Sequence, residues 1–242
     1  MSDVVDNMRP FLAPFTTPLA YEARERVVLE GSGSFVNISG QSYLITCRHV
    51  AERPDFNMFL LNNQLPLQLS GAWENQSDGL DVSIHPISIP KTVVHNSASI
   101  NVSHFSDAFS PVEHETFVFR GISGENTQYG FGTFQYGITT FGGQLVPGLT
   151  SEKFFGVGWR PAHLSYTLGT DEESKFQVLA NNPQGFSGSL VWNTRFLEKK
   201  QSGQTWHPHD AKVFGIAMRY DEAAGAVNCI RIDQFHKWLF DR

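Results

Sequence analysis

Short apolar runs follow one another along most of the chain, and Gly, Pro, Asn and Ser residues separate them. Runs of this length that are rich in Val, Ile, Phe and Tyr are typical of β-strands rather than of helices. They predict strands at residues 26–29, 34–38, 42–46, 58–61, 66–69, 82–87, 116–120, 132–139, 144–146, 163–167, 176–179, 189–192 and 213–218. Many short strands separated by turn residues favour a β-barrel or β-sandwich protein.

Two segments lack this pattern. Residues 1–20 include three prolines, which remove backbone donors and interrupt regular structure, so we expect an extended N-terminal arm. Residues 96–115 are polar and contain few periodic apolar positions. We therefore interpret this segment as the connector between two halves of the protein.

Two local motifs predict a turn and a helix. The pair Ser39-Gly40 stands between two predicted strands and indicates a tight hairpin. Near the C-terminus, Phe235, Trp238 and Leu239 have the i, i+3, i+4 spacing of an amphipathic helix. Asp233 precedes them at the place of an N-cap, so we expect a short C-terminal helix that packs on the body.

Composition and charge narrow the classes of function. The 242-residue chain carries a formal net charge of -6 and no Lys/Arg cluster, which argues against binding to nucleic acid. It contains no run of about 18 apolar residues that could span a membrane, and no basic start with an apolar run that would mark a secretory signal. With two cysteines, Cys47 and Cys229, we expect a cytoplasmic protein, and the sequence does not decide whether they pair.

Three segments far apart in the sequence carry residues suited to nucleophilic catalysis. His49 follows an apolar strand, Asp81 opens another, and Ser187 lies in the glycine-flanked segment 185–189. A serine hydroxyl needs an imidazole to remove its proton and a carboxylate to orient that imidazole. Backbone N–H groups must bind the developing oxyanion, and flanking glycines let the N–H groups of Gly185 and Ser187 converge.

These residues and their contexts resemble the trypsin/chymotrypsin superfamily of serine peptidases, in particular its intracellular bacterial trypsin-like type. The matching motifs are T-x-x-H-V around His49, D-V-x-I from Asp81 and G-x-S-G-S around Ser187. Their order and their separations of 32 residues (81 - 49) and 106 residues (187 - 81) carry the resemblance. The G-x-S-x-G motif of α/β-hydrolases is not matched, because Ser189 stands at the place of its second glycine.

The resemblance implies an all-β fold of two six-stranded antiparallel Greek-key barrels with a short C-terminal α-helix. Residues 21–110 would form the first barrel, with His49 and Asp81, and residues 111–242 the second, with Ser187 and the final helix. It also implies a serine endopeptidase that hydrolyses protein or peptide substrates through an acyl-enzyme intermediate and needs no metal or cofactor.

The same resemblance places residues around the substrate. Asn181 would lie at the base of the specificity pocket, and Met218, Arg219 and Tyr220 would form its wall. A neutral Asn cannot offset the desolvation of a Lys or Arg side chain, so we expect uncharged P1 residues. Phe186 stands where digestive members carry the aspartate that binds a newly cut N-terminus, and activation by such a cut is not expected.

Several alternatives stay open at this stage. Asp78 rivals Asp81 as the orienting carboxylate. His207 and His209 could hold a metal ion, although a polar loop is the commoner explanation of such a segment. The protein could also be a latent protease-like module that binds peptides without cutting them, a defence-associated protease activated by a regulatory partner, or a hydrolase of esters.

Overall fold

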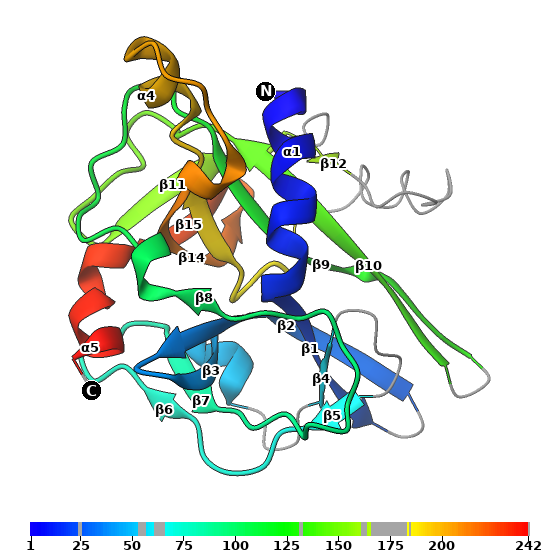
Figure 1. The fold of residues 1–242 in the computed structure, drawn as a ribbon. Helices are drawn as coiled ribbons and strands as arrows, with labels where there is room; N and C mark the ends of the chain where they lie inside the picture. Colours follow the sequence, from blue (N-terminus) through cyan, green and yellow to red (C-terminus); the bar gives the residue numbers. More distant parts are fainter. Residues whose placement is uncertain are drawn as a thin grey trace.

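The computed structural model describes residues 1–23, 26–52, 57–60, 66–130, 133–160, 164–165, 183 and 185–241. Two largely antiparallel sheets dominate it, one blue to cyan and the other green to orange in Figure 1. The first sheet consists of β1 (Thr16–Ala23), β2 (Arg26–Ile38), β3 (Gln41–Thr46), β4 (Asn57–Phe59), β5 (Pro66–Gln68), β6 (Glu74–Asn75), β7 (Ser83–Pro86) and β8 (Ile100–Asn101). Its order is β5-β4-β1-β2-β3-β7-β6, and β8 pairs with β2 in parallel.

The second sheet follows the polar connector in the chain. It consists of β9 (Phe117–Gly130), β10 (Thr133–Gly143), β11 (Phe154–Gly158), β12 (Leu164–Ser165), β13 (Leu190–Asn193), β14 (Lys212–Asp221) and β15 (Ala226–Arg231), in the order β11-β15-β14-β13-β9-β10-β12. The described residues therefore form sheets of eight and seven strands, where the resemblance implies six in each barrel. The prediction of a fold built mainly of antiparallel β-sheet is confirmed.

The tight hairpin at Ser39-Gly40 is confirmed. It joins β2 to β3, with Ile38 paired to Gln41 across a two-residue loop. Both loop residues have positive φ, 51° for Ser39 and 87° for Gly40, which is the combination that a type I′ turn requires. The side chain of Asn37 accepts a hydrogen bond from the Gly40 N–H and holds the turn closed.

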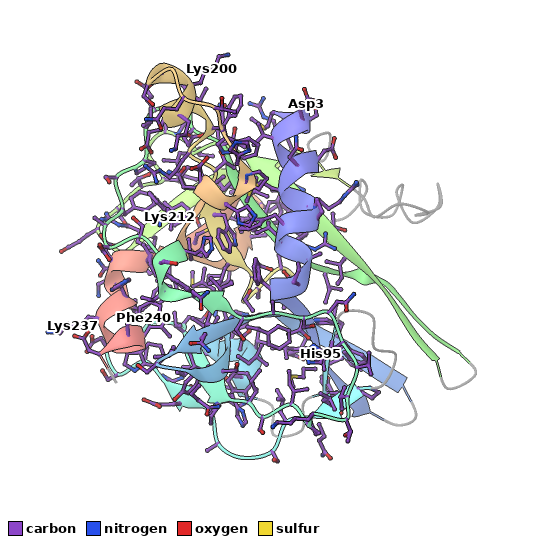
Figure 2. The ribbon with its side chains drawn as sticks, in the orientation of Figure 1. Asp3, His95, Lys200, Lys212, Lys237 and Phe240 are labelled. Atoms are coloured by element: carbon purple, nitrogen blue, oxygen red, sulfur yellow. The ribbon has the colours of Figure 1, made fainter. Side chains whose placement is uncertain are left out.

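The N-terminal segment corrects our expectation of an extended arm. Residues Ser2–Leu12 form helix α1, the 3-10 turn η1 (Ala13–Phe15) follows, and strand β1 begins at Thr16. The buried face of α1 consists of Val4, Val5, Met8 and Leu12. This helix packs against β9, β10 and β12 of the second sheet (Figure 1), while Asp3, labelled in Figure 2, lies on its exposed side. Burial of the apolar face outweighs the backbone hydrogen bond lost at Pro10.

The remaining helices are short, and the described residues contain no helix long and apolar enough to cross a membrane. They are α2 (Arg48–Ala51), α4 (Phe196–Gln201) and α5 (His236–Phe240), together with the 3-10 turns η2 (Val102–His104), η4 (Pro208–Asp210) and η5 (Ile232–Gln234). The predicted C-terminal helix is confirmed as α5, with Phe235 and Leu239 buried. Asp233 does not cap it, because both of its carboxylate oxygens bind the guanidinium of Arg231.

One hydrophobic core runs through both sheets. It includes Leu44 and Ile84 of the first sheet, Val118 and Ile216 of the second, and Met8 of α1. A second, phenylalanine-rich cluster is formed mainly by residues of the second sheet and contains Phe117, Phe119, Phe141, Phe155, Phe186 and Phe214. The two sheets are therefore joined by buried apolar contacts, and the site described next lies between their strands.

Candidate active site

His49 and Asp81 meet because two neighbouring strands of the first sheet end side by side. His49 lies in α2, directly after β3, and Asp81 lies just before β7. Strands β3 and β7 are paired, with Thr46 opposite Ser83, and this pairing brings together segments that are 32 residues apart. The position of His49 therefore depends on a sheet contact as well as on its own segment.

Both carboxylate oxygens of Asp81 bind His49. Asp81 Oδ2 lies 2.5 Å from Nδ1 of the ring, and Oδ1 accepts the main-chain N–H of His49 at 2.8 Å. Two contacts fix both the position and the plane of the imidazole, with Nδ1 as the donor to an ionised carboxylate. Asp78 does not take this place, since its exposed carboxylate accepts a hydrogen bond from Gln76 at 2.9 Å.

The charge of Asp81 is stabilised in the folded protein. Partial burial acts to raise the pKa of Asp81, but the two hydrogen bonds from His49 and the electrostatic interactions with His49 and Arg219 outweigh it. The pKa of the carboxyl group therefore lies below its ordinary value. An ionised Asp81 is what an imidazole needs if Nδ1 is to keep its proton and Nε2 is to act as a base.

Ser187 comes from a turn between the two sheets. Gly185 and Gly188 flank it with φ angles of 97° and 91°, a region that favours glycine. The hydroxyl of Ser187 donates to the main-chain oxygen of Met218 at 2.7 Å. Met218 lies at a β-bulge of β14, where the register with β15 shifts, and its carbonyl is thereby turned toward the site. Among the described residues, no hydrogen bond joins Ser187 to His49.

The segment Gly185–Ser187, called the oxyanion loop below, presents two backbone donors. Within the described part of the chain, neither the N–H of Gly185 nor that of Ser187 donates a hydrogen bond. The ring of Phe186, in the middle of the loop, is buried and lies 5.2 Å from the ring of Phe119 and 5.8 Å from that of Trp159. Aromatic packing, rather than an ion pair, therefore holds the middle of the loop.

Cys47 lies beside the pair but is not a rival nucleophile. Its thiol is fully buried and donates to the main-chain oxygen of Ala217 at 3.2 Å. Burial, with the nearby charge of Asp81, raises the pKa of Cys47 well above its ordinary value, so the thiol stays protonated. Cys229 is also a buried free thiol, so the structure contains no disulfide between them.

The chemistry of the neighbouring donors does not favour a metal ion. Donor atoms of Cys47, His49 and Asp81 lie within 4.8 Å of one another. However, the ligand atoms of His49 and Asp81 are 2.5 Å apart and hydrogen-bonded to each other, and a thiol with a raised pKa is a poor ligand. Within the described residues, His207 and His209 are not part of any such cluster of donor atoms.

The predicted pocket residues divide into two groups. Asn181 lies outside the described residues, so the preference for uncharged P1 side chains stays a prediction. The second group lies near the C-terminal end of β14 and consists of Met218, Arg219 and Tyr220. The Met218 carbonyl accepts a hydrogen bond from the hydroxyl of Ser187. The charge of the exposed Arg219 helps to lower the pKa of Asp81. The ring of Tyr220 lies 6.5 Å from that of Trp159 between centroids.

Our sequence reasoning missed one residue of this region, Ser32 of β2. It is fully buried and bonds to both ends of the oxyanion loop. The available signal was its position between Gly31 and Gly33, because glycines inside a strand often mark a close approach of another backbone. A Cβ atom on Gly31 would lie 2.8 Å from the main-chain oxygen of Ser187.

Comparisons with known proteins bear on the fold. No family model and no curated protein matches the sequence. Among solved structures, the chain is similar to neuropsin, a serine protease expressed in the limbic system of mouse brain, with a TM-score of 0.54 and 13% identity over 95% of this chain and 94% of that one. It is also similar to a serine endoprotease from Yersinia pestis, with a TM-score of 0.55 and 16% identity. That alignment covers 97% of this chain but only 65% of the Yersinia chain.

These likenesses define the class of architecture. The chain has the fold of the trypsin- and chymotrypsin-like serine proteases, at a sequence identity too low to carry an activity across. What the protein does must therefore be argued from the geometry of His49, Asp81 and Ser187.

Proposed function

We propose that the protein is a serine endopeptidase that hydrolyses peptide bonds through an acyl-enzyme intermediate. The observation that carries this proposal is the His49–Asp81 pair, with 2.5 Å between Nδ1 and Oδ2, in a fold shared with serine proteases. Ser187 completes the set of groups that acyl transfer requires, because it stands in a glycine-flanked turn whose N–H groups at Gly185 and Ser187 have no partner among the described residues.

In the proposed reaction, Ser187 Oγ attacks the carbonyl carbon of the substrate while Nε2 of His49 takes the hydroxyl proton. The tetrahedral oxyanion is bound by the N–H groups of Gly185 and Ser187. His49 then gives its proton to the leaving amine, and the acyl group stays on Ser187. A water molecule activated by the same imidazole releases the acid product. Asp81 stays ionised throughout and stabilises the imidazolium.

The hydrogen bond from Ser187 to Met218 favours a second candidate, a latent protease-like module. In this arrangement the hydroxyl points at a carbonyl oxygen rather than at an imidazole. In the endopeptidase proposal, rotation about the Cα–Cβ bond of Ser187 turns the hydroxyl away from this carbonyl and toward His49, and such rotations are fast. A regulatory partner or the substrate itself could select the competent rotamer, and we propose no identity for such a partner.

The proposal is tested by covalent labelling with a fluorophosphonate probe. Wild-type protein should be labelled at Ser187 and Ser187→Ala should not, while Ser189→Ala serves as the control for a neighbouring serine. Activity should survive EDTA, because no step uses a metal. Labelling that persists in Ser187→Ala would identify a different nucleophile, and loss of activity in EDTA would reopen the metal hypothesis.

Turnover separates the candidate functions. A serine endopeptidase cleaves a peptide library, whereas an esterase cleaves ester but not amide substrates. A latent module is labelled slowly or not at all and still binds peptides.

We also propose a cytosolic location, which the two buried free thiols support.

A further inference from the structure

One residue of the first sheet holds both ends of the oxyanion loop. Ser32 lies in β2 and is fully buried. Its main-chain N–H donates to the oxygen of Ser187 at 2.8 Å, and its Oγ donates to the oxygen of Gly185 at 2.7 Å. The loop is thus attached at its first and third residues to a strand that is 153 residues away in sequence from Gly185.

A contact from the second sheet fixes the direction of the Ser32 hydroxyl. The N–H of Ile122, in β9, donates to Ser32 Oγ at 3.0 Å. The hydroxyl has a single proton, and the oxygen of Gly185 can only accept, so the Ser32 proton must point to Gly185. The Ser32 carbonyl accepts in turn from Thr46 Oγ1 at 2.7 Å, which ties this residue to β3 as well.

The oxyanion loop needs such an attachment. Gly185 has a φ of 97° and no side chain, so little in its own conformation prevents the peptide that follows it from rotating. Phe186 cannot form an ion pair, and its ring packing holds only the middle of the loop. The Ser32 hydroxyl supplies a fixed donor to the Gly185 carbonyl. Because a peptide unit is planar, this bond fixes the orientation of the Gly185–Phe186 peptide, which lies between the two N–H groups of Gly185 and Ser187.

We propose that Ser32 is a positioning residue that holds the oxyanion loop in the conformation able to bind an oxyanion, in place of an activating ion pair. This inference rests on the proposed endopeptidase function. Ser32 touches no substrate in this scheme, so its effect is transmitted through Gly185 and Ser187. Removal of the Ser32 hydroxyl should therefore weaken the binding of a tetrahedral species far more than the binding of a ground-state peptide.

The structure offers a matched control at Ser189. Ser189 is also fully buried, and a Cβ atom on Gly121 of β9 would meet both Ser189 Oγ, at 2.3 Å, and Ser32 Oγ, at 2.7 Å. Within the described part of the chain, however, the Ser189 hydroxyl has no hydrogen-bond partner. Ser32→Ala and Ser189→Ala therefore remove the same atom from the same buried neighbourhood, and only Ser32→Ala removes a bond to the loop.

The first test is kinetic. Loss of an oxyanion donor itself costs about 10²–10³ in kcat, so we expect Ser32→Ala to lower kcat and the labelling rate by about 10- to 100-fold with KM nearly unchanged. Binding of a peptidyl trifluoromethyl ketone should weaken by a similar factor, and binding of a product peptide should not. Ser32→Cys keeps a weak donor, so its kcat and labelling rate should lie between those of wild type and Ser32→Ala. It is the variant to measure if Ser32→Ala does not fold. Ser189→Ala should match wild type.

The second test does not depend on activity. Amide hydrogen exchange in residues 185–188 should be faster in Ser32→Ala than in wild type, and unchanged in Ser189→Ala. Equal exchange in all three proteins, or equal loss of turnover in the two alanine variants, would overturn the role of Ser32. A wild type that takes up no probe and cuts no peptide would instead overturn the proposed function, and the exchange experiment would still decide whether Ser32 holds the loop.

Discussion

At the scale of single residues, Asp81 differs from its neighbour Asp78 in what its two oxygens do. Asp81 uses one oxygen for the ring of His49 and the other for its main-chain N–H. Asp78 sits three residues earlier on the surface and interacts with Gln76. In the sequence, the D-V-x-I motif favours Asp81, and in the structure the pairing of β3 with β7 brings its carboxylate to His49.

The contrast between the two carboxylates gives a mutational prediction. Asp81→Asn should lower kcat by about 10⁴, the factor typical of this type of triad, because the imidazole would adopt the wrong tautomer. Asp78→Asn should change kcat by less than about 3-fold, as expected of an exposed side chain outside the site. Steady-state hydrolysis of one peptide by the three proteins makes the comparison. The reverse ranking would assign the orienting role to Asp78.

The lowered pKa of Asp81 predicts how stability depends on pH. A carboxyl group whose folded pKa lies below its unfolded value stabilises the protein fully above the unfolded pKa, about 3.9 for Asp. That contribution is lost as the pH falls through the folded pKa. Urea unfolding of wild type and Asp81→Asn should therefore show a difference that shrinks below about pH 4. A difference that grows on acidification would contradict this sign.

At the scale of elements, α1 shows that burial of an apolar face can outweigh the destabilising effect of a proline inside a helix. Pro10 lies inside the helix, and yet Leu12 beyond it remains buried in the core that both sheets share. Phe11 extends the contact, because its ring lies 5.6 Å from that of Trp192 in β13. The N-terminal segment is therefore part of the folded body rather than an appendage.

The burial of α1 predicts a clear loss of stability on truncation of its side chains. Leu12→Ala should lower the free energy of unfolding by about 2–5 kcal/mol, because Leu12 is only 1% exposed and its removal leaves a cavity. Asn7→Ala, on the exposed side of the same helix, should lie within about 0.5 kcal/mol of wild type. Urea denaturation measures both variants. Equal effects would mean that α1 is not docked as described.

At the scale of the whole molecule, the site is built where the two sheets meet. His49 and Asp81 lie beside strands β3 and β7 of the first sheet, and Ser187 precedes β13 of the second. Ser32 of the first sheet connects the two sheets through its hydrogen bonds to Gly185 and Ile122. The apolar core is continuous across the same boundary. Displacement of one sheet would therefore disturb both packing and the alignment of the proposed triad.

This arrangement predicts activity without cleavage of the N-terminus. Phe186 is buried among aromatic rings, so the oxyanion loop has no acid that could bind a freed amino group. The intact chain should react with a fluorophosphonate probe, and introducing a protease site between α1 and β1 and cutting there should not raise the rate. Reactivity that appears only after the cut would show that the loop is ordered by a new N-terminus.

The sequence by itself determined the features that depend on neighbouring residues. Short apolar runs separated by turn residues predicted the β class, and Ser39-Gly40 predicted the hairpin because its turn requires positive φ. The motifs and their order in the chain suggested His49, Asp81 and Ser187. The chymotrypsin-like fold was predicted in this way and is confirmed. The roles proposed for the three residues stay predictions.

Tertiary structure alone decided what depends on distant residues. Strands β11 and β15, which sequence reasoning missed, gain their order from pairing with each other, and α1 gains it from a face buried on the second sheet. Ser32 reaches Gly185 across 153 residues. Local preferences are worth a few tenths of a kcal/mol per residue, whereas burial and long-range hydrogen bonds contribute about one or more each, so distant contacts prevail wherever the two compete.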